Sequence, residues 1–441
     1  MSAKNQQILD LELGAGRSDA DIREKYQNEL AGKMSKVMDS LFNQLVPGEE
    51  MLLIDKLEIN LGECSEENFL SIFRSRISEQ LRKAFDKKTE KAGRGEEPSK
   101  RLSPGHRELE CFIFFLEKGY FPWWAEKIEL ADFERALSRL LEKPDDKMKI
   151  LLRSRLKRAY APKRLSRQFS LRFNTLLLEL MYPEIIRNIQ SILFKLPEVL
   201  NDISGIRLSM SKLALETYVL ESIWENLAEA RLNVRDYDIS EKVISDIIIK
   251  NNLPTADIMN FLEDKMDVNP EEVEKLITEK EEKNTEKTDE QKKFEKSEEP
   301  EELLIENAGL VIVWPFLQEL YTKLDLLHGS DFKSEKLRER AVLLTQYMVT
   351  GETGIDEPQL VLNKIINGWP LKMPVESKLE MSENEKEIVQ DLLKKLIENW
   401  PALKNTSPAA LQETYLHRNG LLEQDKRSWN LKIERKTVDV L

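Results

Sequence analysis

Residues 306–317 read ENAGLVIVWPFL, an acid and an amide followed by a small Ala-Gly pair, four aliphatic residues and a Trp-Pro corner. The preceding segment, 278–302, is the most charged part of the chain, with eleven acids, six bases and only Phe294 to bury. Apolar content therefore rises from almost nothing to nearly everything within a few positions. This change predicts that a packed domain begins near Leu303 and that the run belongs to its core rather than to a catalytic site.

Length and composition indicate a globular protein of several domains. The 441 residues amount to about three domains at roughly 150 residues each. Hydrophobic residues make up 41% and charged residues 33%, a composition that can bury a sizeable core. The net charge of -13 argues against a protein that coats nucleic acid, because phosphate binding needs a cationic surface.

Cysteine usage and hydropathy predict a protein made in the cytoplasm. Cys64 and Cys111 are too few for a disulfide framework, which favours a reducing compartment. The N-terminus lacks the charged-then-apolar layout of a signal peptide. The longest apolar run, about ten residues, is shorter than the roughly 18 needed to cross a bilayer, so no membrane insertion is expected.

Two charged segments are expected to divide the chain. The predicted organisation is an N-terminal strand-helix block at 1–85, a linker at 86–104, a helical middle block at 105–277, a charged linker at 278–302 and a C-terminal module at 303–441. The charged linker suits either a solvated single helix or a flexible tether. We favour the tether, because Pro300 and the scattered threonines weaken a helix.

The expected fold class is α+β, predominantly α-helical, with a small sheet that includes strands near 53–61 and 429–434. In the first, Leu57, Ile59 and Leu61 alternate with polar residues, and in the second, Trp429, Leu431 and Ile433 do so. Each strand needs a partner, because an isolated strand is not stable. Pairing of the two with each other is one possibility.

Helix signals are clearest in the C-terminal module. Ser382 and Glu385 have the spacing of a capping box, and Trp400 before a proline ends the helix that follows. Ser407-Pro408 restarts a helix with a cap and a first-turn proline, and Asn419-Gly420 is expected to terminate it.

The tryptophans favour packing over binding. Trp314, Trp369 and Trp400 each precede a proline, which makes a rigid aromatic corner, and we expect these rings in the core. Trp123 and Trp124 are adjacent and usually cannot both face inward, so one of them is a candidate contact for a partner.

The sequence carries no pattern typical of an enzyme or a cofactor site. Its three histidines are isolated, and it has neither paired cysteines nor a phosphate-binding glycine loop. Gly93-Arg94-Gly95 lies in a charged linker with no strand before it. We therefore expect no catalytic residues, no metal and no cofactor.

One basic stretch, from Lys147 to Leu178, has ten bases and no acid. Its central residues are Arg153, Arg155, Lys157, Arg158, Lys163, Arg164 and Arg167. It suits either a surface for phosphate or an acidic protein, or a helix face that pairs with acids elsewhere in the chain. We favour the second interpretation. If the patch binds a partner, the total charge favours an acidic protein over nucleic acid.

Several blocks together resemble the contractile injection system tape measure protein family. They are the run at 306–317, RAVLLTQYMVTGETGIDEPQLVLNKIINGWP at 340–370 and NWPALKNTSPAALQETYLHRNGLL at 399–422, with IDKLEINLGE at 54–63 and FLEKGYFPWW at 115–124 as earlier blocks. The motif positions, expected to pack or to contact partners, are Glu306, Asn307, Gly309, Trp314, Pro315, Phe316, Gln346, Gly351, Pro358, Asn363, Gly368, Trp400, Leu403, Ser407, Pro408, Arg418, Gly420 and Trp429, with Trp123 and Trp124.

The resemblance implies a non-catalytic component of a phage-tail-like particle that helps to set the length of the inner tube and sheath. Expected partners are inner tube, baseplate or cap proteins, with self-association a further possibility and nucleic acid not expected. Such a protein would be cytoplasmic during assembly and then lie within or attached to the particle.

A single extended helix would be about 660 Å long, but strands, 17 prolines and 16 glycines forbid that form. Either linkers extend or several copies act, or the chain is a cargo or baseplate adaptor or an assembly chaperone. A nucleic-acid-binding module that uses residues 147–172 is a second alternative.

Overall fold

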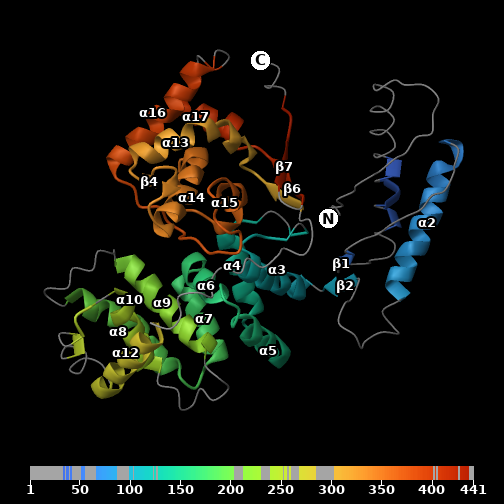
Figure 1. Cartoon of the computed structure of the whole chain (residues 1–441). Helices are drawn as coiled ribbons and strands as arrows, with labels where there is room; N and C mark the ends of the chain where they lie inside the picture. Colours follow the sequence, from blue (N-terminus) through green and yellow to red (C-terminus); the bar gives the residue numbers. More distant parts are fainter. Residues whose placement is uncertain are drawn as a thin grey trace. The chain divides into compact units, whose positions relative to one another are not determined.

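The computed structural model describes most of the chain (Figure 1). The described residues are 33–34, 36–38, 40–41, 51–54, 66–86, 99–102, 104–122, 124–125, 128–202, 212–229, 239–251, 253–255, 258–259, 268–284, 302–400, 403, 406–425 and 428–436. The protein is 69% helical with small antiparallel sheets, which confirms the predicted class. It divides into two compact units, Met1–Glu110 and Cys111–Leu441.

The smaller unit contains β1 (Met51–Ile54), α2 (Glu66–Asp86) and β2 (Ser99–Leu102). β1 pairs antiparallel with β2, from Met51 opposite Leu102 to Ile54 opposite Ser99. α2 buries Phe73 and Ile77, which lie four residues apart on one helix face. The alternating residues 57–61 lie outside the described residues. β2 lies within the segment expected to be a linker, 86–104.

The first half of the larger unit is helical, as expected. It begins in α3 (Pro104–Lys118) and continues through α4 (Leu130–Leu140), α5 (Asp146–Arg155), α6 (Ala161–Gln168), α7 (Leu171–Met181), α8 (Ile186–Asp202), α9 (Lys212–Glu229), α10 (Ile239–Asn251) and α12 (Pro270–Asn284). Phe112 of α3 lies edge-on to Phe169 and Phe173, with ring centroids 5.3 and 5.8 Å away. These buried rings hold α3 against α7.

The second half begins with β3 (Glu302–Ile305). Its further elements are η2 (Ala308–Ile312), α13 (Trp314–Lys323), β4 (Leu327–His328), β5 (Asp331–Phe332), α14 (Glu335–Thr350), η3 (Glu357–Leu360), α15 (Val361–Ile366), α16 (Glu383–Asn399), α17 (Pro408–Leu411), the π-helical turn η5 (Gln412–Leu416), β6 (Gly420–Asp425) and β7 (Ser428–Ile433). α14 is the central helix, because its residues 341–349 are all buried. A helix buried on every side lies inside a core rather than on a surface.

One sheet has the strand order β3-β6-β7. Leu303 pairs with Leu422, and Leu422 pairs with Leu431. The strand expected at 429–434 is therefore confirmed, while β1 and β7 lie in separate sheets and do not pair with each other.

The sequence did not predict β6. Asn419-Gly420 was expected to end a helix, and that expectation was wrong: the helical segment ends at Leu416 and Gly420 begins β6. A side chain at Gly420 would meet the Cβ of Ala308 at 2.6 Å, so close packing against η2, rather than a helix cap, accounts for this glycine.

The other predicted helix ends are present. The Ser382 side chain accepts from the backbone N–H of Glu385, and the Glu385 side chain accepts in return from Ser382, which completes the capping box. Trp400 is the C-cap of the same helix. The Ser407 hydroxyl accepts from the backbone of Ala410 at the start of α17. These helix ends follow from local sequence.

The charged segment 278–302 differs from the expectation at both ends. α12 continues to Asn284, and β3 begins at Glu302. Both flanks belong to the larger unit, in which α12 packs on α10 and β3 pairs with β6. The helical middle block and the C-terminal module thus lie in one compact unit.

Candidate functional site: a buried charge joint

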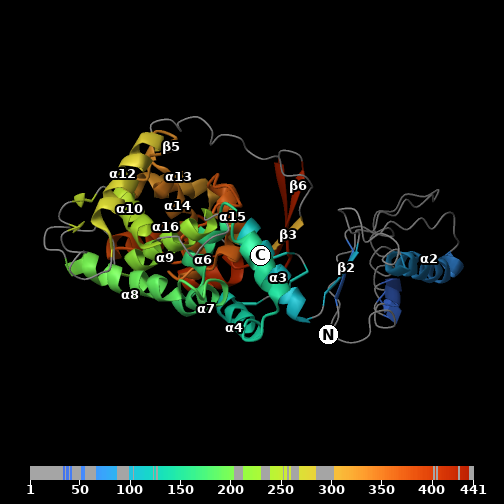
Figure 2. The same ribbon diagram turned by 90° about the horizontal axis from the view of Figure 1, so that it is seen from below.

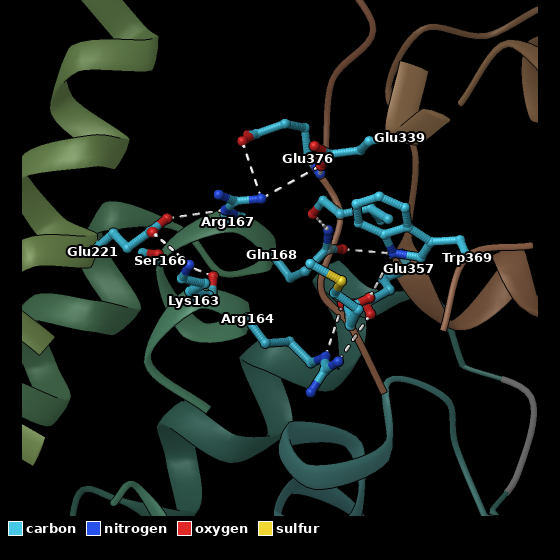
Figure 3. A network of polar contacts seen from close by, with 12 residues as sticks. Lys163, Arg164, Ser166, Arg167, Gln168, Glu221, Glu339, Glu357, Trp369 and Glu376 are labelled. Carbon is cyan, nitrogen blue, oxygen red and sulfur yellow. Dashed lines mark hydrogen bonds and ion pairs between the residues drawn. The ribbon is translucent and has the colours of Figure 1, made fainter. Parts of the chain in front are cut away.

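Three buried charged side chains lie where the helical block meets the C-terminal module, and Figure 3 shows two of them, Arg164 and Glu357. We name Arg164, Glu357 and Lys364 the charge joint. Arg164 extends from α6, and its Nε and Nη2 donate to the two carboxylate oxygens of Glu357 at 2.8 and 3.0 Å. The side chains of Arg164 and Glu357 are both 0% exposed. Such a bidentate pair fixes distance and orientation together.

Lys364 supplies the third charge. Its Nζ donates to Glu357 Oε1 at 2.5 Å and to the carbonyl oxygens of Leu371 and Met373 at 3.0 and 2.9 Å. Three acceptors match the three N–H bonds of an ammonium group, which indicates a charged lysine. Burial lowers the pKa of Lys364, while the Glu357 carboxylate opposes that change.

The C-terminal end of α3 completes the charge joint. Arg164 donates to the carbonyl oxygens of Leu116 and Lys372, the latter at 2.6 Å. Gly119 follows with φ +86, and a Cβ there would meet Glu357 Oε1 at 2.7 Å and Arg164 Nη2 at 2.9 Å. Only glycine allows both that backbone conformation and this close approach.

A second cluster surrounds Arg167 at the edge of the charge joint (Figure 3). Arg167 lies 3.0 Å from Glu221, 3.4 Å from Glu339 and 3.3 Å from Glu376. Burial alone would lower the pKa of Arg167, but these carboxylates outweigh it and raise the pKa above its usual value. Burial also raises the pKa of Glu339, against the effect of Arg167. The cluster links α6 to α9, to α14 and to the loop before α16.

Gln168 ties the two groups of charges together. Its Oε1 accepts from the backbone N–H of Glu357 at 2.9 Å, and its Nε2 donates to the carbonyl oxygen of Val375 at 3.0 Å. Three residues of α6, Arg164, Arg167 and Gln168, contact the C-terminal module. These residues of α6 therefore hold the helical block and the C-terminal module together and do not form an exposed basic surface.

The remaining basic-patch residues have varied surroundings. Arg155 and Arg158 lie 3.2 and 3.9 Å from Glu117. Arg153 donates to the carbonyl oxygen of Met181, and its guanidinium lies over the Tyr182 ring. Lys163 lies 3.7 Å from Glu221, and Lys157 is exposed. Acids elsewhere in the chain thus pair with many of these bases, as the favoured interpretation expects.

The sequence reasoning missed Glu357 and Lys364. Two signals were available: Lys364 is the one charge in VLNKII, and Glu357 directly precedes the motif residue Pro358. A charge inside an apolar helix requires a partner. Nothing local, however, shows that the partner of Glu357 lies 193 positions earlier.

Three motif residues meet in a second, polar network inside the C-terminal module. The Asn307 side-chain amide lies 3.0 Å from Gln346 Oε1 and 2.6 Å from Asn363 Oδ1. Asn363 in turn donates to Thr345 at 3.0 Å. All are buried, so they fix the start of η2 against α14 and α15.

The remaining motif residues mostly shape the backbone around this core. A Cβ on Gly309 would lie 1.8 Å from the carbonyl oxygen of Tyr415, so no side chain fits there. Backbone N–H of Ala308 donates to Arg418 O at 2.9 Å. Three motif prolines, Pro315, Pro358 and Pro408, lie in the first turns of helices. Two motif glycines, Gly351 and Gly368, have positive φ near helix ends. The side chains of Phe316, Leu403 and Trp429 pack in or against the core. Glu306 lies 3.8 Å from His417.

The tryptophan side chains differ in how far they are buried. Trp369 is buried and donates to the carbonyl oxygen of Met373 at 3.1 Å, and Trp400 is half-buried with its ring 5.6 Å from Tyr415. Trp314 is 60% exposed, so the expectation that it lies in the core was wrong. It stands at the first position of α13, where the first turn of the helix directs its ring to solvent. Trp124 is half-buried, and Trp123 lies outside the described residues.

Both networks hold packed elements together. The donors and acceptors of the charge joint bond to one another or to backbone carbonyl groups, whereas the buried Asn307 Oδ1 in the second network has no hydrogen-bond partner among the described residues. Across the described ranges no three His, Cys, Asp or Glu side chains gather as a metal ion would require. No helix in the described part of the chain has the length and hydropathy to cross a membrane.

Comparison with known proteins gives a match over nearly the whole chain. The family model described as contractile injection system tape measure protein matches residues 4–441. No curated protein and no solved structure matches the chain significantly.

Proposed function

This chain belongs to the contractile injection system tape measure protein family, and we propose that it helps to set the length of the inner tube and sheath as a folded body. The family is structural and its members belong to the assembled particle, in association with its other components.

The observation that carries the proposal is the charge joint between the two sides of the charged segment. α12 and β3, which flank residues 285–301, belong to one compact unit. Arg164, before this segment in the chain, binds Glu357, which lies after it and also contacts Lys364. Extending 285–301 therefore cannot draw the helical block away from the C-terminal module unless the charge joint breaks. A compact unit as long as Cys111–Leu441 has a radius of gyration of about 20 Å. A fixed body of this size suits action in several copies or at one end of the tube.

A length series tests the proposal. Duplicating residues 286–300, and separately triplicating them, should leave the distribution of particle lengths unchanged in negative-stain micrographs. An extended ruler predicts the opposite: length would grow by up to about 3.5 Å per added residue and per stretched copy, twice as much for the triplication as for the duplication. Proportional changes of that kind would overturn the proposal.

A matched pair of variants tests the role of the folded body. Glu357→Ala should reduce the number of particles or broaden their lengths, because it leaves Arg164 and Lys364 buried without their acid. Asp391→Ala, which removes an exposed pair with Lys394, should change neither. Equal particle populations from both variants would count against the proposal.

An adaptor for cargo or baseplate is the second candidate. The exposed ring of Trp314 favours it, because a large exposed aromatic side chain is a common contact residue at interfaces. Particles made without the protein that are normal in number and length but lack cargo would favour this candidate. The nucleic-acid alternative loses support, since Lys163, Arg164 and Arg167 already face acids.

A further inference from the structure

The three-stranded sheet ends in an edge strand with paired and unpaired backbone groups at known positions. In Figures 1 and 2 the sheet lies to one side of the helices of the larger unit. β7 is its last strand and pairs with β6 through all six of its residues. The pairing continues one step further, because the N–H of Glu434 donates to the carbonyl oxygen of Asn419 at 3.0 Å.

This hydrogen bond fixes the direction of every backbone group in β7. Successive residues of a strand point their N–H and C=O groups to opposite edges. Since Glu434 faces β6, so do Lys432 and Asn430, whereas Trp429, Leu431 and Ile433 face away. Within the described part of the chain, no hydrogen bond engages the outward N–H groups of those three residues.

The side chains follow the same alternation. Trp429 and Leu431 pack against the apolar core, and Ile433 on the same face is 38% exposed. Asn430 and Lys432 lie on the opposite, exposed face. β7 has no proline, the residue that commonly blocks an edge strand. The free edge of β7 therefore carries hydrogen-bonding groups without a partner strand. One face of the strand carries an apolar row, Trp429, Leu431 and Ile433, whose last residue is exposed.

We propose that β7 pairs antiparallel with β7 of a second copy of this chain, with the two-fold axis at Leu431. This register places Trp429 opposite Ile433 of the second copy and vice versa, so each exposed isoleucine meets a tryptophan. It also makes every outward backbone group meet its complement, because Leu431 would face Leu431 and Trp429 would face Ile433 as hydrogen-bonded pairs. The two sheets then join into one continuous sheet.

Charge is compatible with this register and disfavours an axis at Lys432. Asn430 lies opposite Lys432 of the second copy, so the two lysines do not face each other. An axis at Lys432 would place the two lysines in direct opposition, and an axis at Asn430 would leave Ile433 of each copy outside the paired residues of β7. An axis at Trp429 or Ile433 would shorten the overlap of β7 with itself. The proposal rests on this geometry and not on the proposed role in length control.

Disulfide trapping tests the register in the full-length chain, in a Cys64→Ser background. Asn430 and Lys432 of the second copy would form a non-hydrogen-bonded pair with Cα atoms about 4.5 Å apart. Mixing Asn430→Cys and Lys432→Cys chains under mild oxidation should give a disulfide-linked dimer. Either variant alone should give little, because its thiols would lie on diagonal positions about 7–8 Å apart. Equal trapping in single and mixed samples, or none, would overturn the proposal.

A charge series supplies the equilibrium measurement, by sedimentation over a wide range of concentration. Asn430→Lys should weaken dimerisation by about twofold to thirtyfold, because two like-charge pairs form across the axis. The same substitution places Lys opposite Glu423 within the monomer, so misfolding would not account for the loss. Asn430→Glu should strengthen association relative to the unsubstituted chain, because the new carboxylate would face Lys432 of the second copy, in competition with that lysine's contact to Glu423. An unchanged dissociation constant in both variants would contradict the pairing, as would a monomer at every concentration.

Discussion

At the scale of single residues, Glu357 has the most demanding position in the chain. It is fully buried, and it is the one acid between two buried bases, Arg164 and Lys364. Removing a charge from water costs several kcal/mol, which is recovered only where the geometry and further hydrogen bonds are good. Arg164 and Lys364 gain those bonds by donating to the carbonyl oxygens of Lys372 and Leu371. Loss of Glu357 would leave two like charges facing each other without solvent.

We therefore predict that Glu357→Ala lowers the free energy of unfolding of the larger unit by about 3–5 kcal/mol. Urea denaturation followed by circular dichroism measures the change. Asp391→Ala serves as the control, because Asp391 and Lys394 form an exposed pair whose loss should scarcely alter stability. Equal midpoints for the two variants would show that the charge joint does not hold the unit together.

At the scale of elements, the capping box at the start of α16 shows how a local sequence pattern stabilises a helix. The Glu385 carboxylate accepts from the backbone N–H of Ser382 at 2.8 Å and contacts Arg340 at 2.5 Å. Burial would raise the pKa of Glu385, but these donors outweigh it and lower the pKa. A lowered carboxylate pKa contributes stability above the pKa of the unfolded chain. That contribution is lost as the pH falls through the folded pKa.

Glu385→Gln should therefore destabilise the protein at neutral pH and matter progressively less in acid. The measurement is the difference in unfolding free energy between wild type and variant in a pH series that begins at 7 and passes below the usual glutamate pKa of about 4.3. The difference should shrink once Glu385 is protonated in the wild type. Lys386→Gln, on an exposed neighbouring side chain, is the control for charge alone. A difference that stays constant with pH would refute the role assigned to the carboxylate.

How far each element could be predicted depends on the range of the interactions that form it. Ser382, Ser407 and Trp400 act on residues within a few positions, so their patterns identified helix ends correctly. β6 depends on the approach of Gly420 to Ala308, more than a hundred positions away, and was missed.

The same reasoning applies to the site. Arg164 was singled out within a basic stretch, but its partner depends on how α6 meets η3. The polar triad of Asn307, Gln346 and Asn363 was present among the motif residues, yet spacing in sequence could not show that they touch. The exposure of Trp314 likewise depends on what packs around α13, and local residue types do not fix that.

At the scale of the whole molecule, the charged segment joins two halves that already bind each other. Contacts between them extend beyond the charge joint, since the backbone N–H of Leu130 donates to Asp356 at 3.2 Å and Arg167 contacts Glu339. A covalent link between such halves mainly supplies a high effective concentration, in the millimolar range for a short flexible linker. Cutting it should convert an intramolecular contact into a bimolecular one without removing any contact.

We predict that a chain with a protease site inserted within residues 285–301 stays assembled after cleavage. The two fragments should coelute in size-exclusion chromatography, and the unfolding midpoint should become dependent on concentration, which the uncut chain with the same insertion should not show. Glu357→Ala in the same background should make the cleaved halves separate on dilution, because the charge joint then opposes association instead of favouring it. If the cleaved wild-type halves separated as readily as those of the variant, the segment itself would be what holds them together. The folded-body account of length control would then lose its physical basis.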